Sequence, residues 1–150
     1  PRVEVMEQTN FRYSKLADFH RGQPEFASID VSFISLSLIL PPLAEILKPA
    51  GKVVALIKPQ FEAGKEKVGK HGIIKDPAVH QEVIEHVFAF ATAAGFAVEQ
   101  LDFSPIKGGQ GNIEFLAQLA LVGPAQAHVA PTIDIAAVVA AAQTELNAKK

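Results

Sequence analysis

Three ionisable residues fall where an α/β sheet would bring them to one edge. Asp30 lies at the end of a short strand-like run, and Lys58 follows the apolar run Lys52–Ile57. In open α/β sheets, ligands bind outside the carboxyl ends of the parallel strands. Glu114 opens the last strand-like run, which must return antiparallel and therefore starts at the same edge. Two acids around a lysine suit proton transfer or stabilisation of a developing negative charge. An ion triad that only fixes strand register stays an open alternative.

The placement of these residues depends on an alternation of β-rich and helical segments. Such alternation is typical of an α/β fold with a mostly parallel sheet. The last two strands are joined by a turn without a helix, which predicts an antiparallel hairpin at the C-terminal end of the sheet. The apolar run 33–40 fits a strand and a helix equally well. The expected strands are 3–6, 27–31, Lys52–Ile57, Phe96–Phe103 and 113–122, and the expected helices are 14–19, 43–48, 77–94 and 133–147.

The composition indicates one globular core in a reducing compartment. The chain has 150 residues, of which 49% are hydrophobic and 20% charged, and its net charge is −2. These values argue against disorder and against a wholly basic nucleic-acid binder, but they allow a local basic patch. The chain has no cysteine, which excludes disulfide scaffolds, thiolate metal sites and cysteine nucleophiles. Neither a signal peptide nor a membrane-spanning segment is evident, and we expect a soluble, cytoplasmic protein without a membrane partner.

Two loops invite a ligand-binding interpretation. The run Gly108-Gly109-Gln110-Gly111 leads into a strand rather than a helix, so it predicts a hairpin turn and not a phosphate-binding loop. The loop 62–75 is the most basic stretch of the chain, with Lys65, Lys67 and Lys70, and is either a solvated loop or a binding site for a polyanion. The histidines are scattered, and we expect no metal site.

Four ordered segments are long enough to compare with known families. They read Asp30-Val-Ser-Phe-Ile-Ser-Leu36, Leu56-Ile-Lys-Pro-Gln-Phe-Glu-Ala-Gly64, Gly69-Lys-His-Gly-Ile-Ile-Lys-Asp76 and Ser104-Pro-Ile-Lys-Gly-Gly-Gln-Gly-Asn-Ile-Glu-Phe-Leu116. Together they resemble the hemolysin A (TlyA) family, which belongs to the FtsJ-like RNA 2′-O-ribose methyltransferases that use S-adenosylmethionine. Glu7-Gln-Thr-Asn-Phe-Arg12 is similar to a further segment of that family. The resemblance implies a partial Rossmann-like methyltransferase sheet, mostly parallel with an antiparallel C-terminal hairpin.

The resemblance also implies a reaction, which is methyl transfer from S-adenosylmethionine to a ribose 2′-hydroxyl of ribosomal RNA. FtsJ-like enzymes carry a catalytic Lys-Asp-Lys-Glu tetrad, and Asp30, Lys58 and Glu114 match its last three members. Lys58 would orient the hydroxyl and stabilise the developing oxyanion, and only secondarily act as general base, because the two acids favour its ammonium form. Asp30 would steady Lys58 and stand near the methionine end of the cofactor.

Binding residues outside this set are implied by the same resemblance. Thr9 and Asn10 lie where related enzymes meet the adenine of the cofactor. Lys65, Lys67 and Lys70 would cover the mouth of the site and hold phosphates of ribosomal RNA within the ribosomal subunit.

The resemblance divides the chain into two parts. Residues 1–122 correspond to the C-terminal part of an FtsJ-like methyltransferase domain, and residues 123–150 form a linker and a C-terminal helix packed on the same domain. The family's first two strands, its Gly-rich cofactor loop and the first lysine of the tetrad have no counterpart here. We therefore expect the reaction in the full-length parent and an inactive chain in isolation. The strand expected at 3–6 would lack its neighbours, so we expect it to be poorly ordered or re-paired. A bared sheet edge also invites dimerisation.

Two other functions stay open. A non-enzymatic module that binds RNA or the ribosome would keep the fold without cofactor chemistry, although such a module has no need of Asp30, Lys58 and Glu114. A membrane-active hemolysin is disfavoured, because the C-terminal helix lacks the Lys/Arg-rich polar face of interfacial helices.

Overall fold

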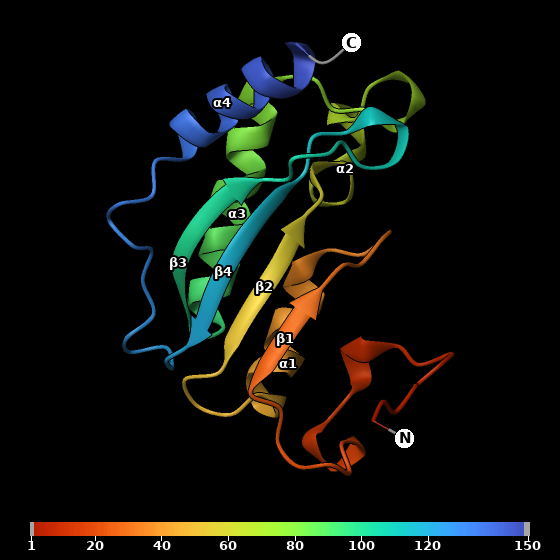
Figure 1. Ribbon diagram of the computed structural model, residues 1–150, viewed down its shortest axis with the longest axis vertical. Coiled ribbons are helices and arrows are strands. Elements are labelled where there is room, and N and C mark those ends of the chain that lie inside the picture. The colour runs from red at the N-terminus through yellow and green to blue at the C-terminus, as the bar shows by residue number, and fades with distance from the viewer. Residues whose placement is uncertain (1, 149–150) are drawn as a thin grey trace.

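The core of the fold is a four-stranded sheet (Figure 1). The structure is a computed structural model that describes residues 2–148, so the first residue of the predicted domain and the last two of the predicted tail lie outside the described residues. The strand order is β1-β2-β4-β3. The strands are β1 (Phe26–Ile29), β2 (Lys52–Ile57), β3 (Phe96–Phe103) and β4 (Phe115–Leu121).

The directions of the strands agree with the sequence prediction. β1 pairs with β2 in parallel, and β4 lies antiparallel between β2 and β3. Three strands therefore run in one direction and β4 alone runs against them, which confirms the α/β class with an antiparallel C-terminal hairpin. Because β4 pairs directly with β2, Ile57 at the end of β2 faces Phe115 at the start of β4. This pairing brings the residues after β2 and those before β4 to one edge.

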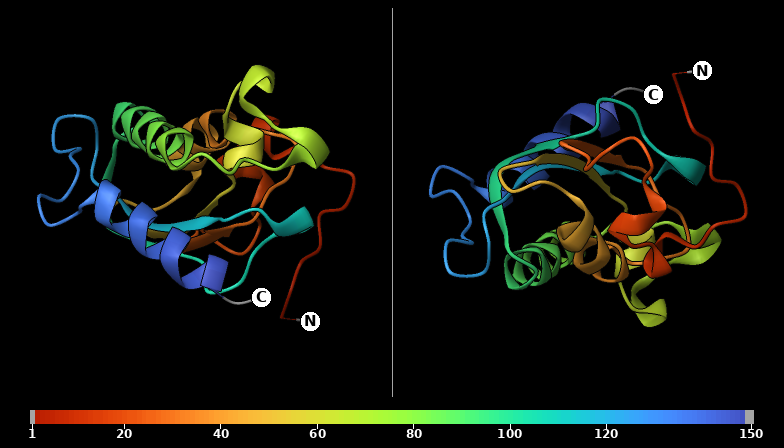
Figure 2. Two further views of the ribbon diagram at one scale, coloured as in Figure 1. Left: turned by 90° about the horizontal axis from the view of Figure 1, so that it is seen from above. Right: turned by 90° about the horizontal axis from the view of Figure 1, so that it is seen from below.

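Helices cover both faces of the sheet (Figure 2). α1 (Leu40–Ile46) and α3 (Pro77–Ala93) lie on one side, and α4 (Ile135–Ala148) lies on the other. α3 begins as predicted, because the Asp76 carboxylate accepts a hydrogen bond from the Ala78 amide and Pro77 occupies the first turn. α4 packs against β3 and α3, and its buried side chains are Val139, Ala142 and Leu146. No helix within residues 2–148 has the length and apolar character to cross a bilayer.

Several segments differ from the sequence predictions. Residues 3–6 form no strand and take no part in the sheet. An extended segment needs neighbouring strands to be stable, and within the described chain no strand pairs with this one. The helix expected at 14–19 is one 3-10 turn, Leu16–Asp18. The ambiguous run 33–40 is mostly a turn with a 3-10 segment, and α1 starts at Leu40, because the two prolines that follow fit a first helical turn. β4 starts at Phe115, so Glu114 precedes the strand instead of opening it.

The two edges of the sheet are treated differently. The linker covers the β3 edge, where Val98 donates to the His128 carbonyl at 2.8 Å and accepts from the Ala130 amide at 2.8 Å. On the side of β1 away from β2, no strand of residues 2–148 pairs with it, and the Phe26 side chain is exposed. An uncovered edge presents unpaired backbone groups and favours association with another strand.

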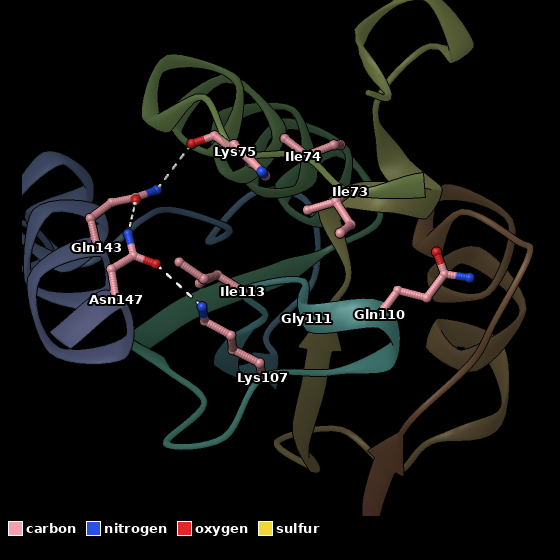
Figure 3. Close-up of a pocket in the computed structure, with 9 residues that line it drawn as sticks. All are labelled: Ile73, Ile74, Lys75, Lys107, Gln110, Gly111, Ile113, Gln143 and Asn147. Carbon is pink, nitrogen blue, oxygen red and sulfur yellow. Dashed lines mark hydrogen bonds between the residues drawn. The ribbon is translucent and has the colours of Figure 1, made fainter. Parts of the chain in front are cut away.

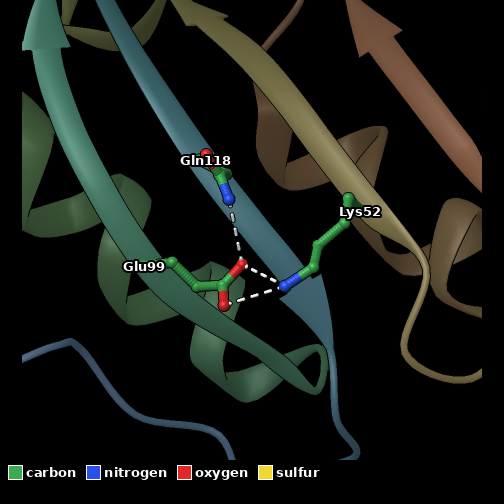
Figure 4. A network of polar contacts seen from close by, with 3 residues as sticks. All are labelled: Lys52, Glu99 and Gln118. Atoms are coloured by element: carbon green, nitrogen blue, oxygen red, sulfur yellow. Dashed lines mark hydrogen bonds and ion pairs between the residues drawn. The ribbon is translucent and has the colours of Figure 1, made fainter.

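A polar network ties three strands together on the sheet face away from α1 and α3 (Figure 4). The Lys52 ammonium lies 2.6 and 2.9 Å from the two carboxylate oxygens of Glu99, and Gln118 donates to that carboxylate at 3.2 Å. These hydrogen bonds hold the pKa of Glu99 below its ordinary value. The network spans β2, β4 and β3 and therefore fixes their relative register.

Candidate functional site

Lys58 and Asp30 form an ion pair at the carboxyl ends of the two parallel strands. The Lys58 Nζ lies 2.6 Å from an Asp30 carboxylate oxygen and 3.3 Å from the Ser32 hydroxyl. The lysine side chain is only 14% exposed, whereas the aspartate side chain is 70% exposed. The parallel register that sets Ile29 opposite Ala55 brings the residues after both strands within reach of each other. The ammonium is thus held in a largely buried position by an acid that faces solvent.

Glu114 lies at the same edge but belongs to a different contact set. Its carboxylate is buried at 6% exposure and accepts a hydrogen bond from the Gln60 amide nitrogen at 3.1 Å. Within the described chain it forms no ion pair with Lys58. The expected convergence of two acids on the lysine therefore becomes one ion pair and one separate buried carboxylate.

Lys58 and Glu114 nevertheless face one cavity of about 360 Å³. We call it the Lys58–Glu114 cavity, and its walls include Ser32, Phe33, Lys58, Gln60, Phe61 and Glu114. Asp30 does not line this cavity. It lines a neighbouring hollow of about 300 Å³, which is mainly apolar and includes Phe11 and Ile29. The Asp30–Lys58 pair consequently stands between two hollows.

Gln60 gives the Lys58–Glu114 cavity an unused acceptor. A carboxylate can only accept hydrogen bonds, so the Gln60 amide must turn its nitrogen toward Glu114. The Oε1 atom of Gln60 is then buried without a hydrogen-bond partner. An unpaired buried acceptor is costly, on the order of 1–3 kcal/mol, and such groups are found where a polar network serves function as well as stability. Gln60 was not among the predicted site residues, although it lies two residues after Lys58 on α2 (Pro59–Glu62).

An aromatic pair marks the mouth of the cavity. The rings of Phe33 and Phe61 lie 4.8 Å apart between centroids, and the Phe61 ring lies 6.0 Å from the Lys58 ammonium. Phe33 is 90% exposed and has a φ of 61°, which is uncommon for a bulky residue. A strained, exposed aromatic residue at a cavity mouth is a candidate for stacking on a planar ligand.

Glu62 anchors the loop that carries Phe33. Its carboxylate accepts hydrogen bonds from the Ser35 hydroxyl at 2.6 Å and from the Leu36 amide at 2.8 Å. Burial raises the pKa of Glu62, while these two hydrogen bonds oppose the rise. The contacts join the loop after β1 to α2 and thereby fix both sides of the cavity.

Asn112 plays a similar part on the opposite side. The side chain is buried, and its oxygen accepts from the Ile74 amide at 3.0 Å while its nitrogen donates to the Gly72 carbonyl at 2.9 Å. Asn112 therefore clamps the end of the basic loop to the turn before β4. Asn112 was not among the predicted site residues either.

Thr9 and Asn10 lie on the surface in a local turn. The Thr9 hydroxyl donates to the Glu7 carbonyl, and the Asn10 side chain accepts from the Arg12 amide. Both side chains are exposed, and neither lines the hollow beside Asp30. Their neighbour Phe11 does line it.

The three lysines of the basic loop differ in their contacts. Lys67 forms an ion pair with Glu82 of α3, with Nζ 2.6 Å from each carboxylate oxygen, and lowers the pKa of Glu82. Lys65 and Lys70 are exposed in short 3-10 turns. Exposed ion pairs are weak and exchange readily with other anions, so the Glu82 contact does not occupy Lys67 permanently.

Comparisons with known proteins agree on one family. The sequence profile of the FtsJ-like methyltransferases matches residues 1–121. The chain is 53% identical over 150 residues to "Putative rRNA methyltransferase YqxC" of Bacillus subtilis, covering 99% of the chain and 53% of that protein. It is 35% identical over 119 residues to "16S/23S rRNA (cytidine-2′-O)-methyltransferase TlyA" of Mycobacterium tuberculosis, covering 79% of the chain and 44% of that protein.

A solved structure gives the same result for the fold. The protein named "Putative hemolysin from Streptococcus thermophilus" is 54% identical, with a TM-score of 0.92 over 98% of this chain and 52% of that one. The chain thus spans about half the length of the curated relatives that it matches.

Proposed function

The chain belongs to the FtsJ-like methyltransferase family, and from this premise we propose that it serves, within its full-length protein, to methylate a ribose 2′-hydroxyl of ribosomal RNA. The observation that carries the proposal is the Lys58 ammonium, which is held by Asp30 and faces a cavity that it shares with Glu114. The names of the relatives support ribosomal RNA as the substrate. Such a substrate would place the protein in the cytoplasm.

The cavity residues suit the orientation of a hydroxyl group. Lys58 can donate a hydrogen bond to the ribose oxygen and stabilise the negative charge that develops on it. Gln60 lines the same cavity, and its buried carbonyl oxygen has no hydrogen-bond partner within the described chain. Glu114 fixes the orientation of the Gln60 amide. Alignment of the hydroxyl with the methyl group supplies much of the rate of an in-line displacement.

The hollow beside Asp30 fits part of an S-adenosylmethionine site. Its apolar wall, which includes Phe11 and Ile29, can pack against a flat ring, and the Asp30 carboxylate can attract a positively charged group. When bound, the cofactor would supply a methyl group activated on a sulfonium; the ribose oxygen held at Lys58 would take this methyl group as the S–C bond breaks, and the hydroxyl proton would pass to solvent water. Thr9 and Asn10 are proposed to contact the adenine of the cofactor, because they directly precede Phe11, which lines this hollow.

The surface around the cavity suits RNA. Phe33 and Phe61 can stack on a base that is turned out of its helix, because aromatic faces bind unstacked bases. Lys65, Lys67 and Lys70 stand on the loop above the cavity and can contact phosphates. These contacts would place the ribose over Lys58.

The proposal is tested with Lys58→Ala in the full-length enzyme, using methyl incorporation into ribosomal RNA as the measurement. We expect methylation to be lost while the affinities for cofactor and RNA stay nearly unchanged. Lys48→Ala removes an exposed lysine at the other end of the sheet and should leave methylation intact. Retained methylation in Lys58→Ala would remove Lys58 from the mechanism. A module that only binds RNA would instead show no methylation in the unchanged protein.

A further inference from the structure

A second cavity, of about 370 Å³, lies beside the Lys58–Glu114 cavity and has no role in the mechanism above (Figure 3). We call it the α4 cavity. It is enclosed by residues 73–75, residues 107–113 and the C-terminal half of α4, and the side chains that matter are Ile73, Ile113, Lys75, Lys107, Gln143 and Asn147. Its volume falls within the range of ligand sites, roughly 300–1,000 Å³.

The two cavities share one wall, and neighbouring residues of that wall face opposite sides. Gly72 and Asn112 line the Lys58–Glu114 cavity, whereas Ile73 and Ile113, which follow them directly, line the α4 cavity. Gln110 lines both cavities. The hydrogen bonds from Asn112 to the 72–74 segment hold this wall together. A linear polymer that passes over Gln110 can therefore occupy both cavities at once.

The polar side of the α4 cavity is a chain of amides. Gln143 donates to the Nδ1 atom of buried His80 at 3.2 Å, and the Asn147 amide nitrogen donates to the Gln143 oxygen at 2.9 Å. The Asn147 oxygen accepts from the Lys107 ammonium at 3.3 Å. Figure 3 shows Gln143 and Asn147 of α4 and Lys107 of the loop before β4 pointing toward one another. Side-chain amides are the groups that read the edges of nucleobases.

The charge of the cavity indicates an anionic ligand. Lys75 and Lys107 both line it, and within residues 2–148 neither forms an ion pair with a carboxylate. The lining contains no acidic side chain, which excludes a cation site. Ile73 and Ile113 add an apolar surface that can pack against a flat ring. An apolar surface, base-reading amides and two lysines together match one nucleotide with its phosphate.

We propose that the α4 cavity binds the nucleotide adjacent to the one whose ribose lies at Lys58, in a single-stranded stretch of RNA. This inference rests on the proposed function, because it assumes that RNA occupies the Lys58–Glu114 cavity. The base packs against Ile73 and presents its edge to Asn147, whose amide keeps one free N–H. Gln143 orients Asn147, because its own nitrogen already donates to His80 and to the Lys75 carbonyl. Lys75 and Lys107 hold the phosphate. The α4 cavity thereby contributes to the choice of the methylated position through a neighbouring base.

The test is an NMR titration of this chain with a short single-stranded RNA, a trinucleotide, in which the side-chain amide signals of Gln143 and Asn147 are followed. We expect both signals to shift, and to shift in the Lys58→Ala variant as well. The double variant Lys75→Ala, Lys107→Ala should remove most of the shift. Both lysines are exposed, so the variant should keep the spectrum of the folded chain elsewhere. A matched control, Lys15→Ala with Lys48→Ala, removes the same charge from exposed positions that do not line either cavity.

Salt dependence gives a second readout for the same variants. If both lysines contact phosphate, their removal should lower the slope of log K against log [salt] by about 0.7 per lysine. Shifts confined to residues of the Lys58–Glu114 cavity would overturn the α4 cavity proposal and leave the proposed function standing. No shift at any residue up to millimolar RNA would also overturn it. Equal shifts with inorganic phosphate alone would reduce the cavity to an anion site and contradict recognition of a base.

A methylation assay separates the two proposals. Loss of activity in Lys58→Ala with an intact shift at Gln143 supports both. An intact shift in a full-length enzyme that transfers no methyl group would sink the proposed function while the α4 cavity proposal survives.

Discussion

The Lys58 ammonium lies 2.6 Å from the Asp30 carboxylate, in a pair whose cation is largely buried and whose anion is largely exposed. Asp30 therefore holds the Lys58 ammonium in position from the solvent side, and the Ser32 hydroxyl is a weaker second partner at 3.3 Å. Such a pair is more valuable for position than for stability, because exposed carboxylates are screened by water.

Asp30→Asn should reduce methyl transfer far more than it reduces stability. Without the charge of Asp30, Lys58 loses its main partner, and a misplacement on the order of 1 Å costs about 10²-fold in rate. We expect a loss of about 1 kcal/mol in the free energy of unfolding, since the pair is only partly screened. The measurements are kcat in the full-length enzyme and urea unfolding of the chain. Glu25→Gln breaks the Lys48–Glu25 pair, which is 2.8 Å long and far from the cavity, and should leave kcat unchanged. An unchanged kcat in Asp30→Asn would contradict the positioning role.

Gly108→Ala should disturb Glu114 without straining the backbone. Gly108 has a φ of −77°, which alanine adopts freely, but a Cβ atom there would collide with the Glu114 carboxylate. The carboxylate would have to move away, and the Gln60 amide would lose its fixed orientation. We expect at least a tenfold fall in kcat of the full-length enzyme. Gly109→Ala is the matched control, because a Cβ atom at Gly109 meets no atom within 4 Å. Equal activity of the two variants would show that the position of Glu114 is unimportant.

The fold could be predicted from the sequence where local patterns and packing agree. The run Lys52–Ile57 is bounded by Lys52 and Lys58, and the structure gives the strand the predicted limits. Asp76 is a favourable N-cap residue and Pro77 is favourable in the first helical turn, so the start of α3 was also predicted correctly. The pattern of residues 3–6 predicts a strand, but a strand needs a partner, and the resemblance already implied that the neighbouring strands are missing. These residues accordingly form no strand in the structure.

The site was harder to predict because contacts between distant segments decide it. Topology placed Asp30, Lys58 and Glu114 at one edge, and they do lie there. Topology could not show that Glu114 accepts a hydrogen bond from Gln60 and forms no ion pair with Lys58. This contact depends on the short helix α2 and on the space that glycine leaves at position 108. Asn112 was missed for a similar reason, because its partners lie about 40 residues away along the chain. Pattern and spacing predict position along a strand, whereas side-chain pairing across loops requires the folded chain.

The open β1 edge predicts concentration-dependent association of this chain. Phe26 on β1 is exposed, and no strand of the described residues covers that edge. A second copy can pair there through backbone hydrogen bonds and bury the phenylalanine. We expect sedimentation analysis to show dimers at high concentration, and Phe26→Lys to shift the equilibrium toward the monomer. Ile106→Lys, which changes an even more exposed apolar residue in a loop, should not. A monomer at all concentrations would contradict association through β1.

Acid should destabilise the chain through His80. The side chain is fully buried, and desolvation lowers its pKa, although the contact with the Ile74 carbonyl and the charge of Asp76 oppose the shift. With Gln143 donating to Nδ1, the proton lies on Nε2, which donates to the Ile74 carbonyl at 3.1 Å. The unfolded chain takes up a proton below about pH 6.5 and the folded chain does so only at lower pH. The contribution of neutral His80 is therefore complete above that value and is lost as the pH falls, by at most about 1.4 kcal/mol per pH unit.

Urea unfolding between pH 8 and pH 5 should show this decline, and His80→Gln should flatten it at the cost of lower stability throughout. His86→Gln, at an exposed position on the same helix, should keep the decline, and equal curves for both variants would exclude His80 as its source.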